Sequence, residues 1–106
     1  MNYKIIISNE AHEDFSEINK YISWYLKNEK AANKLINKIL VGIKQLEVFP
    51  KRHQLCDEPL LLKKGIRYLL TNNFKTLFYV DDEKNIVYIL RIIYAKRDIN
   101  SVIFSI

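Results

Sequence analysis

The sequence predicts an α+β fold in which a helical hairpin packs on one face of a four-stranded sheet. A short β-branched run opens the chain, and two long segments with apolar residues at helical spacing follow it. The second half then holds three apolar runs separated by polar turns. With 106 residues and only two Gly and two Pro, residues 1–106 are expected to form a single domain.

The first strand is expected at 3–8, in the run "YKIIIS". Ser8 or Asn9 can cap the helix that follows, and acidic residues in its first turns favour the positive end of the helix dipole. This helix is expected to fray near Asn28. Its apolar residues recur at steps of four, three, four and three, and form one stripe: Ala11, Phe15, Ile18, Ile22 and Tyr25.

A second helix is predicted to follow and to stop at Pro50. Two adjacent amphipathic helices with a short connection pack as an antiparallel hairpin. Gly42 lies inside the apolar pattern and is expected to mark a point of close packing. The predicted stripe is wider than the first: Ala32, Leu35, Ile36, Ile39, Leu40, Ile43 and Leu46.

From Lys51 to Pro59 the pattern lapses, and a loop is predicted. Three strands are then expected, roughly at 61–70, 74–80 and 86–94, joined by turns at "NN" and "DDEKN". The last strand is apolar at almost every position, as a central strand covered on both faces would be. The first strand is therefore expected to pair beside it.

Alternation sorts the side chains of each strand into two faces. The sets without charge suit the face beneath the helices: Ile66, Tyr68, Leu70, Phe74, Thr76, Phe78, Val80, Ile86, Tyr88, Leu90, Ile92 and Tyr94. The remaining sets form a helix-free face with three cations and an aromatic residue: Arg67, Lys75, Arg91 and Tyr79. Arg97, which follows the last strand beside Lys96 in "YAKRD", can reach the same surface.

Two interpretations of these cations remain open. They either keep an uncovered sheet face soluble or bind phosphates or an acidic peptide. The same predicted face also holds five apolar residues, and such a face is usually covered by something. We therefore expect the isolated protein to aggregate or to form homodimers. These apolar residues are Leu69, Leu77, Val87, Ile89 and Ile93.

Charge and composition narrow the class of protein. Residues 1–30 carry a net charge of −1 and residues 31–106 a net charge of +6, which suggests nucleic acid or an acidic protein segment as partner. The single cysteine, Cys56, fits a reducing cytoplasm. The N-terminal apolar run is too short for a signal peptide or a membrane span. A soluble, cytoplasmic protein that does not enter membranes is expected.

Cofactor chemistry is not expected. The two histidines and the cysteine, at positions 12, 53 and 56, do not have the spacing of a metal site. A Gly-rich phosphate loop and a serine nucleophile motif are both absent from the sequence. His12 and His53 are expected to be surface residues rather than catalysts.

Four stretches together cover nearly the whole chain: "YKIIISNEAHEDFSEINKYI", "AANKLINKILVGIKQLEVFP", "GIRYLLTNNFKTLFYV" and "VYILRIIYAKRD". In their order and spacing they resemble the RelE/ParE superfamily of type II toxin–antitoxin toxins. The resemblance implies a growth-inhibiting toxin of the kind found in plasmid stabilisation systems. It also implies a cognate antitoxin, encoded by an adjacent gene, that lays a segment across the toxin.

Within this superfamily, RelE-like toxins cut mRNA on the ribosome, whereas ParE-like toxins poison DNA gyrase. Arg67 and Arg97 match basic positions of the RelE-like pattern. Leu69 and Thr76 stand where that pattern has further cations, and Ile103 or Phe104 stands where it has a tyrosine. Tyr94 occupies a position where many relatives have a histidine.

This deficit in proton-transfer groups favours the ParE-like branch. A metal-independent RelE-like mRNA endonuclease, or a degenerate toxin that only binds its antitoxin or acts as a regulator, remains an alternative. For an enzyme, the candidate catalytic residues are Arg67, Lys75, Tyr79 and Arg97. The candidate residues for binding the target or the antitoxin are Arg67, Leu69, Lys75, Leu77, Tyr79, Arg91, Tyr94, Lys96 and Arg97.

Overall fold

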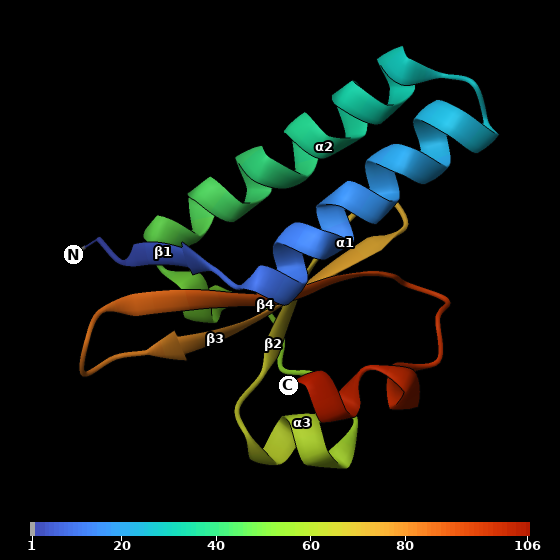
Figure 1. The fold of residues 1–106 in the computed structure, drawn as a ribbon. Coiled ribbons are helices and arrows are strands. Elements are labelled where there is room, and N and C mark those ends of the chain that lie inside the picture. The colour runs from blue at the N-terminus through green and yellow to red at the C-terminus, as the bar shows by residue number, and fades with distance from the viewer. Residues whose placement is uncertain (1) are drawn as a thin grey trace.

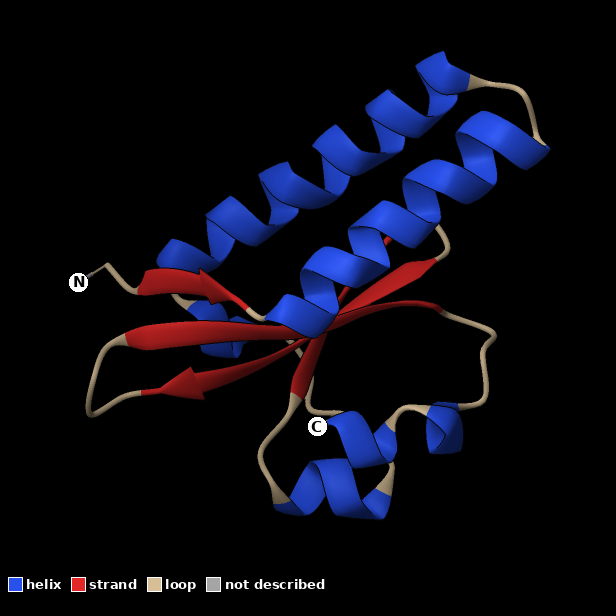
Figure 2. Ribbon diagram, viewed as in Figure 1, coloured by secondary structure: helices blue, strands red, loops and turns tan. Residues whose placement is uncertain are grey.

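A helical hairpin, a sheet and a group of short helices lie in three layers in the structure, a computed structural model that describes residues 2–106 (Figure 1). Figure 2 shows the two long helices on one side of the sheet and the short helices on the other. The predicted α+β architecture is therefore confirmed, but the third layer was not predicted. No helix among residues 2–106 is long and apolar enough to cross a membrane.

The hairpin consists of α1 (Asn9–Lys20), which continues into a π-helical turn at Tyr21–Tyr25, and α2 (Glu29–Lys44). Each helix begins at a side-chain cap. The Ser8 hydroxyl accepts a hydrogen bond from the Ala11 N–H at 3.0 Å, and the Asn28 side chain accepts one from the Ala31 N–H at 3.0 Å. The regular α-helix of α1 ends at Lys20, whereas the sequence predicted that this helix frays near Asn28. Asn28 instead caps the start of α2.

The sheet has the strand order β1-β4-β3-β2. β1 (Lys4–Ile7) runs parallel to β4 (Ile86–Tyr94), while β3 (Phe74–Asp81) is antiparallel to both β4 and β2 (Arg67–Thr71). The prediction that the first strand pairs beside the last is confirmed. β4 is consequently central, which explains why it is apolar along nearly its whole length.

A β-bulge in β4 makes part of the predicted face assignment wrong. Leu77 pairs with Arg91, but its neighbour Phe78 pairs with Ile89, so Leu90 is an extra residue in β4. A bulge places two residues opposite one and shifts the alternation of side chains. Before the bulge, Val87 and Ile89 lie beneath the helices; after it, Ile92 does.

The predicted faces of β2 are also wrong, because of the turn at 72–73. A two-residue turn pairs Thr71 with Phe74, so Leu69 pairs with Thr76 and Arg67 with Phe78. Paired residues share a face, which places Arg67, Leu69 and Thr71 beneath the helices. Ile66, Tyr68 and Leu70 lie on the opposite side, which we call the outer face.

The outer face is covered by the chain itself. Residues 61–66 were predicted as strand, but α3 (Pro59–Lys63) forms here, with Pro59 at its first position and Glu58 as its cap. Gly65 follows with a φ of 76°, a conformation that glycine adopts readily. α3 and the C-terminal turns at Ile99–Ser101 and Ile103–Ser105 cover a second hydrophobic cluster: Cys56, Leu61, Ile66, Leu77, Ile93 and Val102. Leu77 and Ile93 are therefore covered and do not form part of a bare apolar face. Such a face was the reason for expecting aggregation or homodimers.

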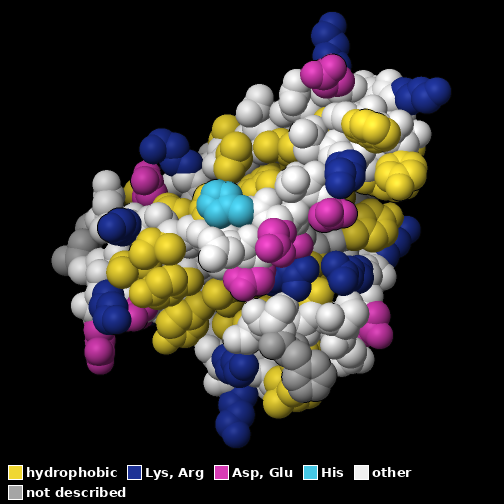
Figure 3. Space-filling view, in the orientation of Figure 1, with side chains coloured by type: hydrophobic (Ala, Val, Ile, Leu, Met, Phe, Trp, Pro, Cys, Tyr) yellow, Lys and Arg dark blue, Asp and Glu magenta, His cyan; other side chains and the backbone are white. Residues whose placement is uncertain are grey.

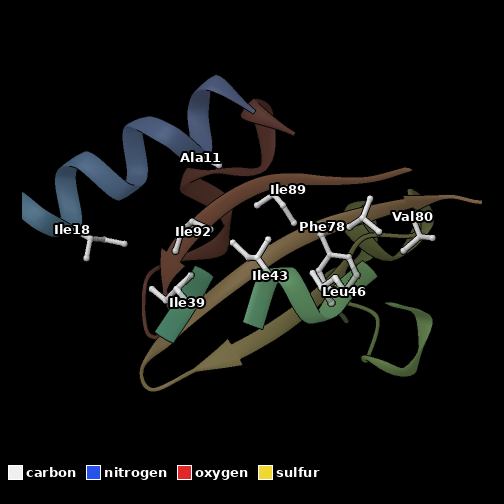
Figure 4. Close-up of a cluster of buried hydrophobic side chains, with 10 residues drawn as sticks. Ala11, Ile18, Ile39, Ile43, Leu46, Phe78, Val80, Ile89 and Ile92 are labelled. Atoms are coloured by element: carbon white, nitrogen blue, oxygen red, sulfur yellow. The ribbon is translucent and has the colours of Figure 1, made fainter. Parts of the chain in front are cut away.

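The main core lies between the hairpin and the sheet, where α1, α2, β3 and β4 all contribute buried side chains (Figure 4). Gly42 is the predicted point of close packing, and this is confirmed, since a Cβ there would lie 3.0 Å from Leu69 Cδ2. Two predicted core residues are instead exposed: Tyr25 (76% exposed), which the π-helical turn moves out of the stripe, and Leu40 (40% exposed) on the outer side of α2.

His53, which was expected at the surface, is half-buried. Its ring packs edge-on against Phe78, and its Nε2 is buried without a hydrogen-bond partner among the described residues. Burial lowers the pKa of His53 below its ordinary value of 6.5, and the nearby charges of Arg52 and Arg67 lower this pKa further.

This environment predicts a loss of stability in mild acid. The unfolded chain takes up a proton at His53 near pH 6.5, whereas the folded chain does so only at lower pH. The contribution to stability is therefore present above about pH 6.5 and is lost as the pH falls through the lowered pKa. Urea unfolding at pH 7.5 and pH 5.0 checks this: the wild type should lose more stability between the two pH values than a His53→Gln variant. Equal losses would contradict the prediction.

Candidate functional site

Arg67 is anchored by hydrogen bonds to two backbone carbonyl groups. Its guanidinium donates to the carbonyl oxygens of His53 at 2.7 Å and of Lys51 at 3.2 Å. These bonds tie the segment after α2 to the edge strand of the sheet. The RelE-like pattern has a cation at the position of Thr76. Thr76 is 1% exposed and lies beneath the helices, so a cation at this position would not reach the outer face.

Arg91 is paired with a residue that the sequence interpretation missed. Its Nε lies 2.7 Å from Asp14 Oδ2 and its Nη2 lies 2.8 Å from Asp14 Oδ1, a two-bond contact in which the side chains are only 13% and 11% exposed. The hydrogen bonds that Arg91 donates to the Asp14 carboxylate raise the pKa of Arg91. A third bond, from the Ile92 N–H to Asp14 Oδ2 at 2.8 Å, ties the same carboxylate to the strand.

The position of Asp14 follows from the length of β1. This strand stops at Ile7, so β4 has no neighbouring strand beyond Ile89 on that side. The Ser8 hydroxyl donates to the Leu90 carbonyl oxygen, and the Asp14 carboxylate accepts from the Ile92 N–H. These two side chains thus take the place of the backbone hydrogen bonds that a longer β1 would have made to β4. The sequence did hold a signal, because Asp14 stands three residues after Ala11 and four before Ile18, on the buried stripe.

Lys75 and Arg97 do come together, at a cleft of about 250 Å³ on the outer face. Lys75 Nζ lies 4.7 Å from the centre of the Tyr68 ring, a cation–π contact, and the Tyr68 hydroxyl donates to Gln54 Oε1 at 2.7 Å. The carboxylates of Asp57 and Glu58 line the same cleft, which we call the outer cleft. Its two cations are therefore matched by two acids.

The outer cleft offers little for proton transfer. Burial raises the pKa of the Cys56 thiol, which keeps this residue protonated at neutral pH. Neither of the two histidines lines the cleft. Glu58 is occupied as the cap of α3, where it accepts from the Leu61 N–H at 2.9 Å.

The remaining residues that were predicted to bind a target or antitoxin lie in several different parts of the structure. Leu77 is fully buried, and Leu69, which is half-buried, packs against the main core. Tyr79 is 39% exposed on the outer face, away from the outer cleft. Lys96 is exposed. The predicted single binding surface is therefore split.

A larger depression, the α1–β4 groove, lies where β1 stops short, and its volume is about 1030 Å³. Ile18, Ile22 and Phe74 give it an apolar lining, and Tyr94 packs edge-on against Phe74 with ring centres 5.7 Å apart. Two acidic residues of α1, Glu13 and Glu17, and the cation Arg97 also line it. The apolar residues of this groove were predicted as core. The end of the first strand was predicted, but its register against β4, which leaves β4 without a neighbour beyond Ile89, was not.

A comparison with known protein families gives a match that covers most of the chain. Residues 5–99 match the model of a family described as the ParE toxin of the type II toxin–antitoxin system parDE. The chain is therefore a toxin of a type II toxin–antitoxin system. It belongs to the ParE toxin family.

Solved structures show the same fold at low sequence identity. The chain is similar to one from the chromosomal ParDE toxin–antitoxin system of P. aeruginosa (TM-score 0.72, 20% identity, 89% of this chain and 97% of that one). It is also similar to a chain of the toxin–antitoxin complex RelBE2 from Mycobacterium tuberculosis (TM-score 0.60, 18% identity, 89% and 99%). A third match is a free variant of the E. coli toxin RelE (TM-score 0.56, 16% identity, 99% and 93%).

A search of curated proteins gives no significant match to the sequence. Among residues 2–106, no group of three His, Cys, Asp or Glu side chains is placed to hold a metal ion.

Proposed function

We propose that this toxin inhibits growth by binding DNA gyrase, without catalysing a reaction itself. The observation that carries the proposal is the composition of the outer cleft. RNA cleavage needs a base, an acid and cations that stabilise the charge of the transition state. Lys75 and Arg97 supply cations, but Asp57 and Glu58 oppose the binding of a phosphate, and both histidines lie elsewhere.

A second candidate function is that of a RelE-like, ribosome-dependent mRNA endonuclease. One observation favours it: Lys75 and Arg97 line one cleft together with Tyr68, and two cations beside an aromatic ring suit a nucleotide. Gyrase and the ribosome are both cytoplasmic, and the toxin is proposed to act in that compartment.

Pulse-labelling of DNA and protein synthesis just after induction in bacteria separates the two functions. We expect an early fall in DNA synthesis while translation continues. An early fall in protein synthesis would instead support the endonuclease. A culture that induces toxin and antitoxin together is the control, and neither rate should fall there. Unchanged synthesis of both kinds after induction of the toxin alone would contradict both functions.

We also propose that the α1–β4 groove receives the antitoxin. Its apolar residues Ile18, Ile22, Phe74 and Tyr94 suit the apolar face of an antitoxin segment, and Glu13 and Glu17 suit a basic flank of that segment. The similar structures from P. aeruginosa and M. tuberculosis are described as a toxin–antitoxin system and a toxin–antitoxin complex, which supports a cognate antitoxin as the partner here.

A further inference from the structure

The end of the helical hairpin exposes four large apolar side chains. Tyr21, Trp24, Tyr25 and Leu26, which we call the tip patch, are between 56% and 78% exposed. Figure 3 shows hydrophobic side chains together with Lys or Arg side chains at this end of the molecule, at the upper right. Single exposed apolar residues are ordinary, but a contiguous apolar patch marks an interaction site.

Three residues of the tip patch, Tyr21, Trp24 and Tyr25, lie in the π-helical turn at Tyr21–Tyr25. The Leu26 N–H donates to the Tyr21 carbonyl oxygen, five residues back, at 3.3 Å. In a continuous α-helix Tyr25 would extend the stripe formed by Ile18 and Ile22, but the wider turn moves it into solvent. π-Helical turns are rare and frequently lie at functional sites.

The charge around the tip patch is positive. Residues 17–30 hold three lysines, Lys20, Lys27 and Lys30, against two acids, Glu17 and Glu29. No ion pair involves any of the three lysines in the part of the chain that the structure describes. Their charges are therefore available to an acidic partner.

We propose that the tip patch is the surface through which this toxin holds an acidic region of its protein target, with Trp24 as the central anchor. This inference rests on the proposed function, in which the toxin acts by binding. Trp and Tyr dominate binding energy at protein interfaces, because each combines a large apolar area with a polar group. A depression of about 500 Å³ beside Trp24 offers hydrogen-bonding groups to the same partner, and its other lining residues are Ser16, Asn19, Lys20, Ser23, Glu29 and Asn33.

Other occupants fit the tip patch less well. A second copy of the chain would bring two sets of lysines together, and like charges at an interface are repulsive. A membrane would have to accept the charge of Glu29 and the amide of Asn28 at the same end, both of which are exposed. The antitoxin is proposed to fill the α1–β4 groove, which Tyr21 and Leu26 border but Trp24 and Tyr25 do not.

Binding of purified toxin variants to purified DNA gyrase tests the inference, with circular dichroism as the check on folding. A Trp24→Ala/Tyr25→Ala variant should bind gyrase at least about 30-fold more weakly than the wild type, as expected when interface anchors are lost. A Lys20→Glu/Lys27→Glu/Lys30→Glu variant should bind weakly at low salt, and its binding should no longer weaken as the salt concentration rises. Both should bind the antitoxin with wild-type affinity. Phe49→Ala removes an aromatic side chain as exposed as Tyr25 (76%) at another surface and should bind gyrase normally.

Gyrase binding by the tip variants at wild-type strength would overturn this inference alone. It would also be overturned if the variants lost only antitoxin binding, or only binding to vesicles of phosphatidylglycerol, which would identify the antitoxin or a membrane as the occupant. A wild-type toxin that does not bind gyrase would overturn the proposed target, and this inference with it.

Discussion

Replacing Asp14 by alanine is expected to destabilise the fold by about 3–5 kcal/mol, the cost of removing one partner of a buried ion pair. The change leaves the Arg91 guanidinium, which is 13% exposed, without its carboxylate. It also removes the acceptor of the Ile92 N–H in the central strand. Urea unfolding followed by circular dichroism at pH 7 measures the loss.

Two further variants test whether the loss of stability comes from the buried Asp14–Arg91 pair or from the removal of any acidic side chain. Asp82→Ala removes an acid that pairs with Lys51 at 2.7 Å on the surface, and it should leave stability nearly unchanged. Asp14→Leu/Arg91→Met replaces both buried charges by apolar groups and should recover much of the stability that Asp14→Ala loses. If Asp14→Ala were as harmless as Asp82→Ala, the structural importance of this pair would be refuted.

Replacing Tyr94 by alanine is expected to weaken antitoxin binding by about 30-fold or more, which corresponds to the 2 kcal/mol typical of an interface anchor. The ring packs on Phe74 in the α1–β4 groove and remains 42% exposed, so it is both held in place and available to a partner. Isothermal titration of the toxin with its antitoxin gives the affinity. The variant should still arrest growth, and co-expressed antitoxin should no longer prevent that arrest.

Tyr79→Ala is the matched control for Tyr94→Ala. Tyr79 is the same residue type, is 39% exposed, and lies on the outer face away from the groove. Its loss should leave antitoxin affinity within about twofold of the wild type, as expected for a residue outside the interface. Equal weakening by both variants would contradict the assignment of the groove.

Local pattern was enough to predict the hairpin, the order of β1 and β4, and the close contact at Gly42. Each of these depends on spacing along one element or on an apolar run that is visible in the sequence. The faces of β2 and β4 depend instead on register between strands: the pairing of Thr71 with Phe74 and the bulge at Leu90. A shift of one residue moves every side chain to the other face, so small errors in register misplaced Arg67, Leu69, Val87 and Ile89.

The candidate site was harder to predict than the fold because it depends on contacts between distant segments. Lys75 and Arg97 were correctly predicted on the outer face, but α3 and the C-terminal turns, which cover much of that face, were not. The "EPLLLKKG" stretch did carry a signal for α3: an acidic cap, a proline at the first position and a glycine after the end. Nothing in the local sequence around Arg91 indicates a partner 77 residues away.

The short first strand has a consequence for how this toxin distinguishes partners. In many complexes an added strand is recognised through its backbone, which is the same for every sequence. Here the Ser8 hydroxyl and the Asp14 carboxylate already bond to backbone groups of β4 next to the groove. A segment that enters the groove is therefore read mainly by its side chains. If the antitoxin occupies the groove as proposed, we expect that changing a few residues in the groove and in the antitoxin keeps related toxin–antitoxin pairs from cross-reacting.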